Sequence, residues 1–455
     1  MPLPRLAPAS GAWRTWQELP ISAGAAGRAA LARERGRGLG GIWLRYNDAD
    51  ATVSDVAQLL ADSLGDGDVE LAAEWAGDST AGGVLVAAAM GIGLAPERLR
   101  GCLGCDPLGA LARGASVSGS AYVQVAAAAR WAAAHAPAMR AALVSTAPYA
   151  DAGADAVQEI AFALATGAET LRWLLEDGFT PADAAAQVLV STTVGRDLYL
   201  QVAKLRALRL TWRMLLASVD APPSALRLHA RTAWRTKGRR DPGTDLVRAT
   251  VETFAAVLGG CDDVTTSPLL DAEEELALGM PLGSATQLLL REEVGLDRVA
   301  DAVVGSWYVE SLTAALARRA WEAFEGIERR GGMTRELTVG AVAQQVAAAA
   351  ERRRRALLEG DLPIVGVTLH WAKQAMPLPH RPLVVEPDAD PPLRHPTDVP
   401  FAGDTLFALA VNAAECGATL GELARTAPAH PPALRAPALV PWRDAELFEA
   451  AEVSA

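Results

Sequence analysis

The chain is poor in cysteine, in aromatic residues and in long uncharged apolar runs. Its 455 residues include four cysteines, of which only Cys102 and Cys105 are spaced as a CxxC pair. So few cysteines argue against a disulfide framework, and no second pair or spaced histidines complete a metal site. No apolar run reaches about 18 uncharged residues, and the segment MPLPRLAPASG lacks a secretory signal pattern. We therefore expect a cytoplasmic chain with no membrane span and no metal ligands.

Positive charge is also in short supply. The sequence has 42 Lys and Arg against 54 Asp and Glu, a formal net charge of −12. An acidic balance argues against general nucleic-acid binding, because phosphate contacts need clustered basic side chains. The one dense basic run, Arg352–Arg355, falls in an alanine-rich predicted helix, where a solvated helix end explains it. We expect no nucleic-acid partner.

Apolar residues, by contrast, make up 51% of the chain, enough for a large core. Strand candidates separated by helical patterns recur at roughly 30- to 50-residue intervals, which predicts a (β/α)8 TIM barrel of the α/β class. No GxGxxG or GxxxxGK[ST] motif follows a strand. The strand candidates are Ile42–Tyr46, Val69–Ala73, Leu99–Gly104, Ala141–Thr146, Gln187–Ser191, Leu226–Ala230, Val264–Thr266 and Pro363–Thr368.

Composition divides the chain into three parts. Residues 1–38 are interpreted as an N-terminal extension with one helix near Ala25–Arg35, which glycines end. Residues 39–372 form the predicted barrel. Residues 373–455 begin with a proline-rich linker that cannot be helical, followed by a helical segment near Phe401–Leu423.

In such a barrel the functional site lies at the carboxyl ends of the strands. His229 is a candidate general acid or hydrogen-bond donor, or simply a buried histidine satisfied by its neighbours. Arg206, near Lys204 on a predicted helix, is a candidate for gripping a carboxylate, or part of a helix-surface salt bridge. Small hydroxyl residues fit a polar channel and helix caps equally well. The strand-end candidates are Asp106, Tyr149, Asp151, Ser191, Thr192, Thr193, His229, Arg231, Thr265, Thr266 and Ser267.

Several colinear segments resemble the barrel domain of the methylmalonyl-CoA mutase family. They include GIWLR at 41–45, DPLG at 106–109, YADAGADAVQEIAFALATGAETLR at 149–172, VAKLRALRLTW at 202–212, RLHARTAW at 227–234 and WRDAELFEA at 442–450. The resemblance implies an isomerase barrel that acts on an acyl-CoA. It also implies adenosylcobalamin, which the family binds in a separate domain marked by DxHxxG. That motif does not occur here, so we expect the cofactor in the holoenzyme only.

The resemblance assigns roles and also exposes losses. The family's substrate-carbonyl histidine falls on His229 and its carboxylate-binding arginine on Arg206. The family pattern HxQTSGWS has become HARTAWRT, with Arg231 in place of glutamine and Trp234 where glycine would leave room for substrate. We expect Trp234 to obstruct a substrate channel. The candidate substrate-binding residues are Arg206, Lys204, Tyr149, Thr192, Arg231 and Thr265, the last of which stands where the family has histidine.

The short form YADAGAD, with GIWLR and DPLG, is most similar to the small, degenerate subunit of the heterodimeric mutases. The favoured hypothesis is a non-catalytic barrel that supports a large catalytic subunit. A second is an active acyl-CoA mutase barrel that uses a separate cobalamin-binding chain. A third is a barrel repurposed to bind CoA or to act as a scaffold. A homodimer is a further possible assembly, and an acyl-CoA a possible ligand.

Overall fold

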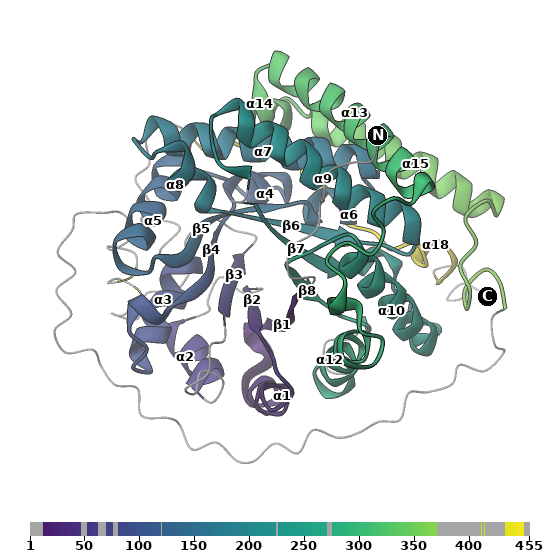
Figure 1. The fold of residues 1–455 in the computed structure, drawn as a ribbon, viewed down its shortest axis with the longest axis horizontal. Coiled ribbons are helices and arrows are strands. Elements are labelled where there is room, and N and C mark those ends of the chain that lie inside the picture. Colours follow the sequence, from purple (N-terminus) through teal and green to yellow (C-terminus); the bar gives the residue numbers. More distant parts are fainter. Residues whose placement is uncertain are drawn as a thin grey trace.

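The computed structural model describes residues 12–46, 52–61, 70–75, 81–119, 121–223, 226–270, 275–370, 411, 414 and 433–449. Its centre is a closed barrel of parallel strands that follow one another in sequence order, β1 to β8 (Figure 1). The predicted (β/α)8 barrel is thereby confirmed. The strands are β1 (Arg14–Pro20), β2 (Gly41–Tyr46), β3 (Glu70–Trp75), β4 (Arg100–Cys105), β5 (Ala138–Ser145), β6 (Val188–Val194), β7 (Arg227–Thr232) and β8 (Asp263–Thr265).

Helices surround the barrel, and a further layer covers one side of it. In Figure 1, α13, α14 and α15 lie outside α7 and α9, and α13 packs on both of these helices. Local sequence explains the helix starts: α7 begins at a capping box in which Asp155 and Gln158 bond each other's backbone N–H groups. The longer helices are α1 (Gly24–Arg35), α2 (Val53–Ala61), α3 (Ala81–Gly91), α5 (Ala121–His135), α7 (Ala156–Glu176), α9 (Leu198–Ser218), α10 (Pro242–Leu258), α12 (Met280–Leu288), α13 (Trp307–Arg329) and α15 (Ala341–Glu359).

Shorter helices complete the frame. The first two follow β4 and β5 directly, at the carboxyl end of the barrel. The shorter helices are α4 (Pro107–Ala112), α6 (Ala147–Asp151), α8 (Pro181–Ala186), α14 (Gly332–Thr338) and α18 (Glu446–Glu449).

One strand was missed, and one predicted strand was wrong. Arg14–Pro20 is β1, inside the segment that sequence analysis set apart as an extension, and it pairs with both β2 and β8. Its inward positions carry polar side chains such as Glu18, so it lacks the apolar run that marks a buried parallel strand. Pro363–Thr368 is not a strand: the backbone N–H groups of Val367 and Thr368 both donate to Ile364 O in a tight turn.

The domain division otherwise stays a prediction. Most of residues 373–455 lies outside the described residues, and so does the predicted helix Phe401–Leu423 apart from residues 411 and 414. The predicted helix near Ala25–Arg35 agrees with α1.

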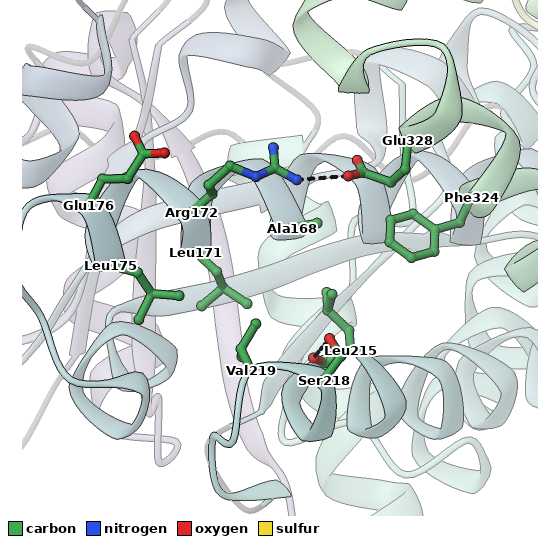
Figure 2. Close-up of a pocket in the computed structure, with 10 residues that line it drawn as sticks. All are labelled: Ala168, Leu171, Arg172, Leu175, Glu176, Leu215, Ser218, Val219, Phe324 and Glu328. Atoms are coloured by element: carbon green, nitrogen blue, oxygen red, sulfur yellow. Dashed lines mark hydrogen bonds and ion pairs between the residues drawn. The ribbon is translucent and has the colours of Figure 1, made fainter.

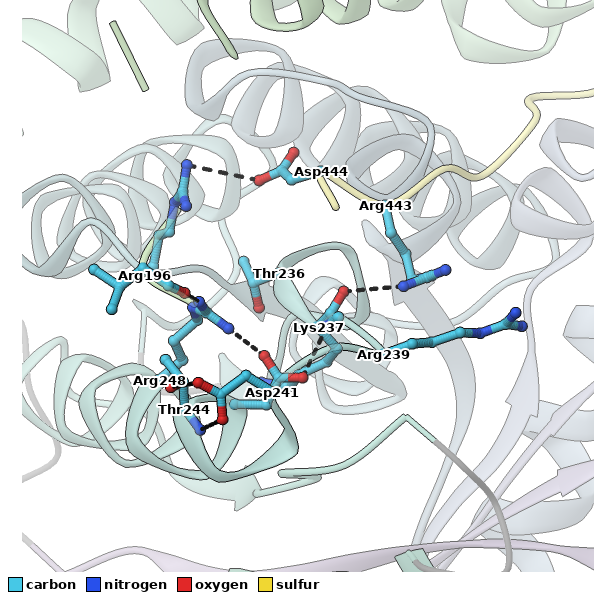
Figure 3. Close-up of polar contacts among 12 residues, drawn as sticks. Arg196, Thr236, Lys237, Arg239, Asp241, Thr244, Arg248, Arg443 and Asp444 are labelled. Carbon is cyan, nitrogen blue, oxygen red and sulfur yellow. Dashed lines mark hydrogen bonds and ion pairs between the residues drawn. The ribbon is translucent and has the colours of Figure 1, made fainter. Parts of the chain in front are cut away.

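The last described segment, residues 433–449, crosses the carboxyl end of the barrel, and we call it the strap. Its backbone bonds to successive parts of that end: Leu439 N donates to Ala112 O, Trp442 N to Asp151 O, and Asp444 N to Arg235 O. Figure 3 shows strap residues Arg443 and Asp444 facing Lys237 and Arg196, which lie in the loops after β7 and β6. The strap therefore ties several loops of the barrel mouth together.

Candidate functional site

The middle of the barrel is filled by two tryptophans. Trp16 and Trp43 are each 1% exposed and meet edge to face, with ring centroids 6.1 Å apart. They pack with Ala72, Cys102, Leu143 and Leu189 in one buried cluster. Gly41 makes room for them, because a Cβ there would lie 2.3 Å from the Trp16 ring. These side chains close the barrel axis at mid-height.

His229 packs against both tryptophans, and we call these three side chains and the cluster around them the plug. The His229 ring stacks on Trp43 at a centroid distance of 4.4 Å, and the residue is 1% exposed. Its Nδ1 is 2.9 Å from Ser191 Oγ and its Nε2 is 2.8 Å from Thr265 Oγ1. Burial, reinforced by the nearby Arg231, lowers the pKa of His229 to about 3. The imidazole is therefore neutral at pH 7, and both ring nitrogens already have a hydroxyl partner.

An ion cluster closes the amino end of the axis. Arg227 bonds both oxygens of Asp263, with Nε 2.6 Å from Oδ2 and Nη2 2.8 Å from Oδ1, and pairs with Glu70 at 2.5 Å. Arg14 binds the other oxygen of Glu70 at 2.5 Å. Trp16 Nε1 donates to Asp263 Oδ1 over 2.9 Å, so the charged layer is tied to the aromatic plug above it.

A second ion cluster lies at the carboxyl end. Arg231 pairs with Glu18 at 3.1 Å and Glu74 at 2.6 Å. Arg113 pairs with Glu74 at 2.5 Å, and Arg45 with Glu18 at 3.1 Å. Although burial raises the pKa of Glu74, Arg231 and Arg113 outweigh it and hold that pKa well below its ordinary value. Three arginines thus share two glutamates above His229.

Above this cluster the molecule is hollow. A cavity of about 560 Å³, which we call the mouth cavity, lies between the second ion cluster and the strap. Three of its lining residues carry a buried polar atom with no hydrogen-bond partner: Arg113 Nη1, Asp151 Oδ1 and Glu275 Oε1. Burial raises the pKa of Asp151 to about 6 and that of Glu275 to about 8. The apolar part of its wall comes from Pro20, Ala147, Pro148, Trp234, Leu269, Leu270, Leu276, Leu439 and Pro441.

Residues 54–389 match the family described as methylmalonyl-CoA mutase. This chain belongs to that family. It is 36% identical over 367 residues to the methylmalonyl-CoA mutase small subunit of Streptomyces virginiae, covering 79% of this chain and 58% of that protein. It is 37% identical over 241 residues to the small subunit of Propionibacterium freudenreichii subsp. shermanii, covering 51% of this chain and 37% of that protein.

A third relative, the methylmalonyl-CoA mutase of Escherichia coli (strain K12), is 33% identical over 226 residues, or 48% of this chain and 31% of that protein. This chain therefore spans between about a third and three fifths of the relatives it matches. The solved carboxyl transferase domain of Rhizobium etli pyruvate carboxylase covers 82% of this chain, and 64% of that chain is covered, at 11% identity and a TM-score of 0.25. So low a score carries no argument.

The structure brings only some of the mutase-family candidates together. His229, Thr265 and Arg231 share the barrel interior. Arg206 is instead fully buried on α9, where it pairs with Asp301 at 2.6 Å, and it does not line the mouth cavity.

Lys204 and Thr192 belong to another network, at the carboxyl end of β6 where it meets α7 and α9. Lys204 Nζ lies 2.9 Å from Glu159 and 2.6 Å from Thr193 O, and Thr192 bonds both Glu159 and Thr146. Neither residue lines the mouth cavity.

The positions of Tyr149 and Trp234 also differ from those expected of residues that line or obstruct a substrate channel. Tyr149 is 1% exposed and packs on Phe162 at a centroid distance of 5.0 Å. Trp234 is 38% exposed and lines the mouth cavity from the side. The axis is filled deeper down, by Trp16 and Trp43, rather than by Trp234.

Sequence analysis overlooked residues that fill the barrel or line its mouth cavity. Trp16, Glu18, Glu74, Arg113 and Glu275 were not among the candidates. The sequence held a signal for some of them. In three strands a charged residue follows an inward-facing tryptophan or alanine by two positions: Trp16–Glu18, Trp43–Arg45 and Ala72–Glu74. Residues two apart on a strand point to the same face, so this pattern indicates inward charge.

A second cavity, of about 410 Å³, lies in the outer helical layer (Figure 2). Leu171, Leu215 and Phe324 line it from α7, α9 and α13, and Arg172 and Glu328 pair across its rim at 2.7 Å. Most of its lining is apolar, and its charged residues lie on α7 and α13.

Two further findings concern the described part of the chain. No group of three or more His, Cys, Asp or Glu side chains in it is arranged to hold a metal ion. No helix in it is both long enough and apolar enough to cross a membrane.

Proposed function

We propose that this chain is a non-catalytic, small-subunit-like barrel that supports a catalytic acyl-CoA mutase chain. The observation that carries the proposal is the burial of His229 in the packed centre of the barrel. His229, the residue that resembles the family's substrate-carbonyl histidine, is stacked under Trp43 with both ring nitrogens engaged. A general acid or carbonyl donor must come within hydrogen-bonding distance of its substrate, and this imidazole has no free face or free nitrogen.

The energetic cost of opening the axis supports the same proposal. A substrate that entered along the barrel axis would have to displace two fully buried tryptophans. It would also have to separate the ion pairs at both ends of the plug. The scale of these contacts is shown by mutation: removing one partner of a buried ion pair costs about 3–5 kcal/mol, and truncating a buried tryptophan costs a similar amount.

Adenosylcobalamin does not fit the described residues of this chain. Its cobalt ligand in the family is the histidine of a DxHxxG motif, which does not occur in this sequence, and His229 inside the barrel is buried with both ring nitrogens engaged. The strap also crosses the end of the barrel that a cofactor would have to face. We therefore derive no chemical step through cobalt here and assign the cofactor, with the isomerase chemistry it supplies, to a partner chain.

The proposed partner is a large catalytic subunit, because relatives of this chain are named small subunits of methylmalonyl-CoA mutase. A separate cobalamin-binding chain or a second copy of this chain are the alternatives. A cytoplasmic location follows the sequence prediction.

The test is a reconstitution assay. The purified chain is mixed with methylmalonyl-CoA, adenosylcobalamin and any mutase chain that co-purifies from its host, and succinyl-CoA formation is measured with each component omitted in turn. Turnover should need this chain and should stay within about twofold in His229→Ala and in the more conservative His229→Gln. Arg318→Gln, at an exposed position on α13, is the control substitution.

Two results would contradict the proposal. Turnover by this chain and cofactor without a partner would make it a catalytic mutase. Loss of turnover in a folded His229→Gln protein would favour the second hypothesis, an active barrel that uses a separate cobalamin-binding chain.

A further inference from the structure

We propose that the mouth cavity is a binding site for a short carboxylic acid, free of CoA, that also carries a hydrogen-bond donor such as a hydroxyl or ammonium group. The proposal does not rest on the non-catalytic role, because binding is measured on this chain alone. It concerns a different set of residues from the sealed His229.

The cavity has the dimensions and lining of a small-molecule site. Its volume of about 560 Å³ lies within the common range for such pockets, about 300–1,000 Å³. Apolar walls from Trp234, Leu269 and the strap residue Leu439 surround a charged floor. An apolar enclosure with a few polar groups is the usual make-up of a ligand pocket. Ser22 and Arg45 are exposed, and they mark the side on which ligand enters.

Unused hydrogen-bonding atoms define the ligand's chemistry. Arg113 Nη1 is a buried donor without a partner, since this guanidinium reaches Glu74 through Nη2. Glu275 accepts from Leu269 N through Oε2 over 2.8 Å, which leaves its Oε1 unpartnered. With the raised pKa of its carboxyl group, Glu275 keeps a proton at pH 7 and offers a second donor. A ligand carboxylate would satisfy the charged Arg113 donor, and Glu275 would donate to a further oxygen of the ligand.

Asp151 supplies the complementary group. Its Oδ1 is buried and unpartnered, so it would accept a hydrogen bond from the ligand. Leaving a buried polar atom unsatisfied costs about 1–3 kcal/mol, and each of these three atoms would gain a partner on binding. A simple fatty acid would leave the Asp151 oxygen unsatisfied, which is why the proposed ligand carries a donor.

The same geometry argues against a CoA ester. The pantetheine arm and nucleotide need a long passage, and the barrel axis below the cavity is closed by Trp43 and the Arg231–Glu74 pair. Above the cavity the strap residues Leu439 and Pro441 form part of the wall. The enclosed space therefore suits a free acid.

The experiment is a calorimetric titration of the full chain at pH 7. The probes are 3-hydroxybutyrate, 4-aminobutyrate, the methyl ester of 3-hydroxybutyrate, and 3-hydroxybutyryl-CoA. At least one of the two acids should bind with a Kd in the millimolar range or below, and the first two arms show whether the donor is a hydroxyl or an ammonium. The neutral methyl ester and the CoA ester should bind at least about tenfold more weakly.

Two variants locate the site. Arg113→Gln should weaken binding by about tenfold or more, because it removes the charged donor. Ser22→Phe places bulk at the exposed entrance and should abolish binding while leaving the unfolding temperature unchanged. Arg318→Gln is the matched control and should bind as the wild type does.

The proposal is overturned if neither acid binds, if only the CoA ester binds, or if folded Arg113→Gln and Ser22→Phe proteins bind as well as the control.

Discussion

The middle of this barrel is tightly packed, whereas its mouth encloses a cavity. In the middle, Trp16, Trp43 and His229 fill the axis, and both nitrogens of His229 are hydrogen-bonded. In the mouth, the cavity leaves polar atoms of Arg113, Asp151 and Glu275 without partners. A (β/α)8 barrel normally keeps a packed centre and places its site among the loops at the carboxyl end. Here His229, which resembles the family's substrate-carbonyl histidine, lies in the packed centre, and the mouth holds the cavity in which we propose that a ligand binds.

Removing a tryptophan from the plug should have the largest effect on stability. Trp43→Ala should lower the free energy of unfolding by about 3–5 kcal/mol, because it empties a fully buried site and exposes the His229 ring. Urea unfolding followed by circular dichroism measures this. The control is Trp307→Ala on α13, which is 80% exposed and should change stability by less than about 0.5 kcal/mol. Equal effects of the two changes would mean that the axis is not packed as described.

The ion cluster between plug and mouth should have the next largest effect. Glu74→Gln should cost about 1–3 kcal/mol at pH 7, since Arg231 and Arg113 lose a charged acceptor. The pKa of Glu74 is lowered in the folded protein, so its contribution is present above its ordinary pKa and lost as pH falls below it. The difference between wild type and variant in urea unfolding should therefore shrink between pH 7 and pH 3. A difference that grows with acidification would contradict this charge arrangement.

Loosening the strap should affect the mouth but not the plug. Asp444 is held by Arg353, whose Nε lies 2.7 Å from Oδ1 and whose Nη2 lies 2.5 Å from Oδ2. Asp444→Asn should cost about 1–2 kcal/mol and speed amide hydrogen exchange in residues 433–449 while leaving β1 and β2 protected. Glu446→Gln, whose side chain is 43% exposed, is the matched control and should change neither. Faster exchange in β2 would show that strap and plug are one cooperative unit.

The smallest expected change is at the cavity wall. Burial raises the folded-state pKa of Glu275 to about 8, so the protein loses stability from this group as pH rises from its ordinary pKa of 4.5 toward 8. Glu275→Gln removes that dependence and keeps the acceptor for Leu269 N. Its urea midpoint at pH 7 should equal or slightly exceed that of the wild type, with a flatter pH profile between 4.5 and 8. A clearly lower midpoint would show that the carboxyl group is ionised and paired.

The barrel was predictable because several of its strands are apolar runs between helical patterns, as in Val188–Val194. β1 was missed because its inward side chains include Glu18 and its flanks resemble an extension. A strand that points charged side chains into the barrel does not show the continuous apolar run expected of a buried parallel strand.

The candidate site was harder to predict, for a physical reason. Whether His229 is a catalyst or a core residue depends on its neighbours in space: Trp43 comes from β2, far away in sequence, and Thr265 lies 36 residues further along the chain. Arg206 shows the same limit: its partner Asp301 lies 95 residues along the chain. Sequence resemblance places a residue in a family, while contacts decide what its side chain does.

The most direct test of the closed barrel is the protonation of His229 itself. In a nitrogen-15 histidine-labelled sample, nuclear magnetic resonance would follow the imidazole signal that disappears in His229→Gln. We expect it to remain neutral down to about pH 3–4 and to be unmoved by methylmalonyl-CoA. A signal that titrates near the ordinary histidine pKa of about 6.5 and shifts when methylmalonyl-CoA is added would show that the axis is open and that His229 meets substrate.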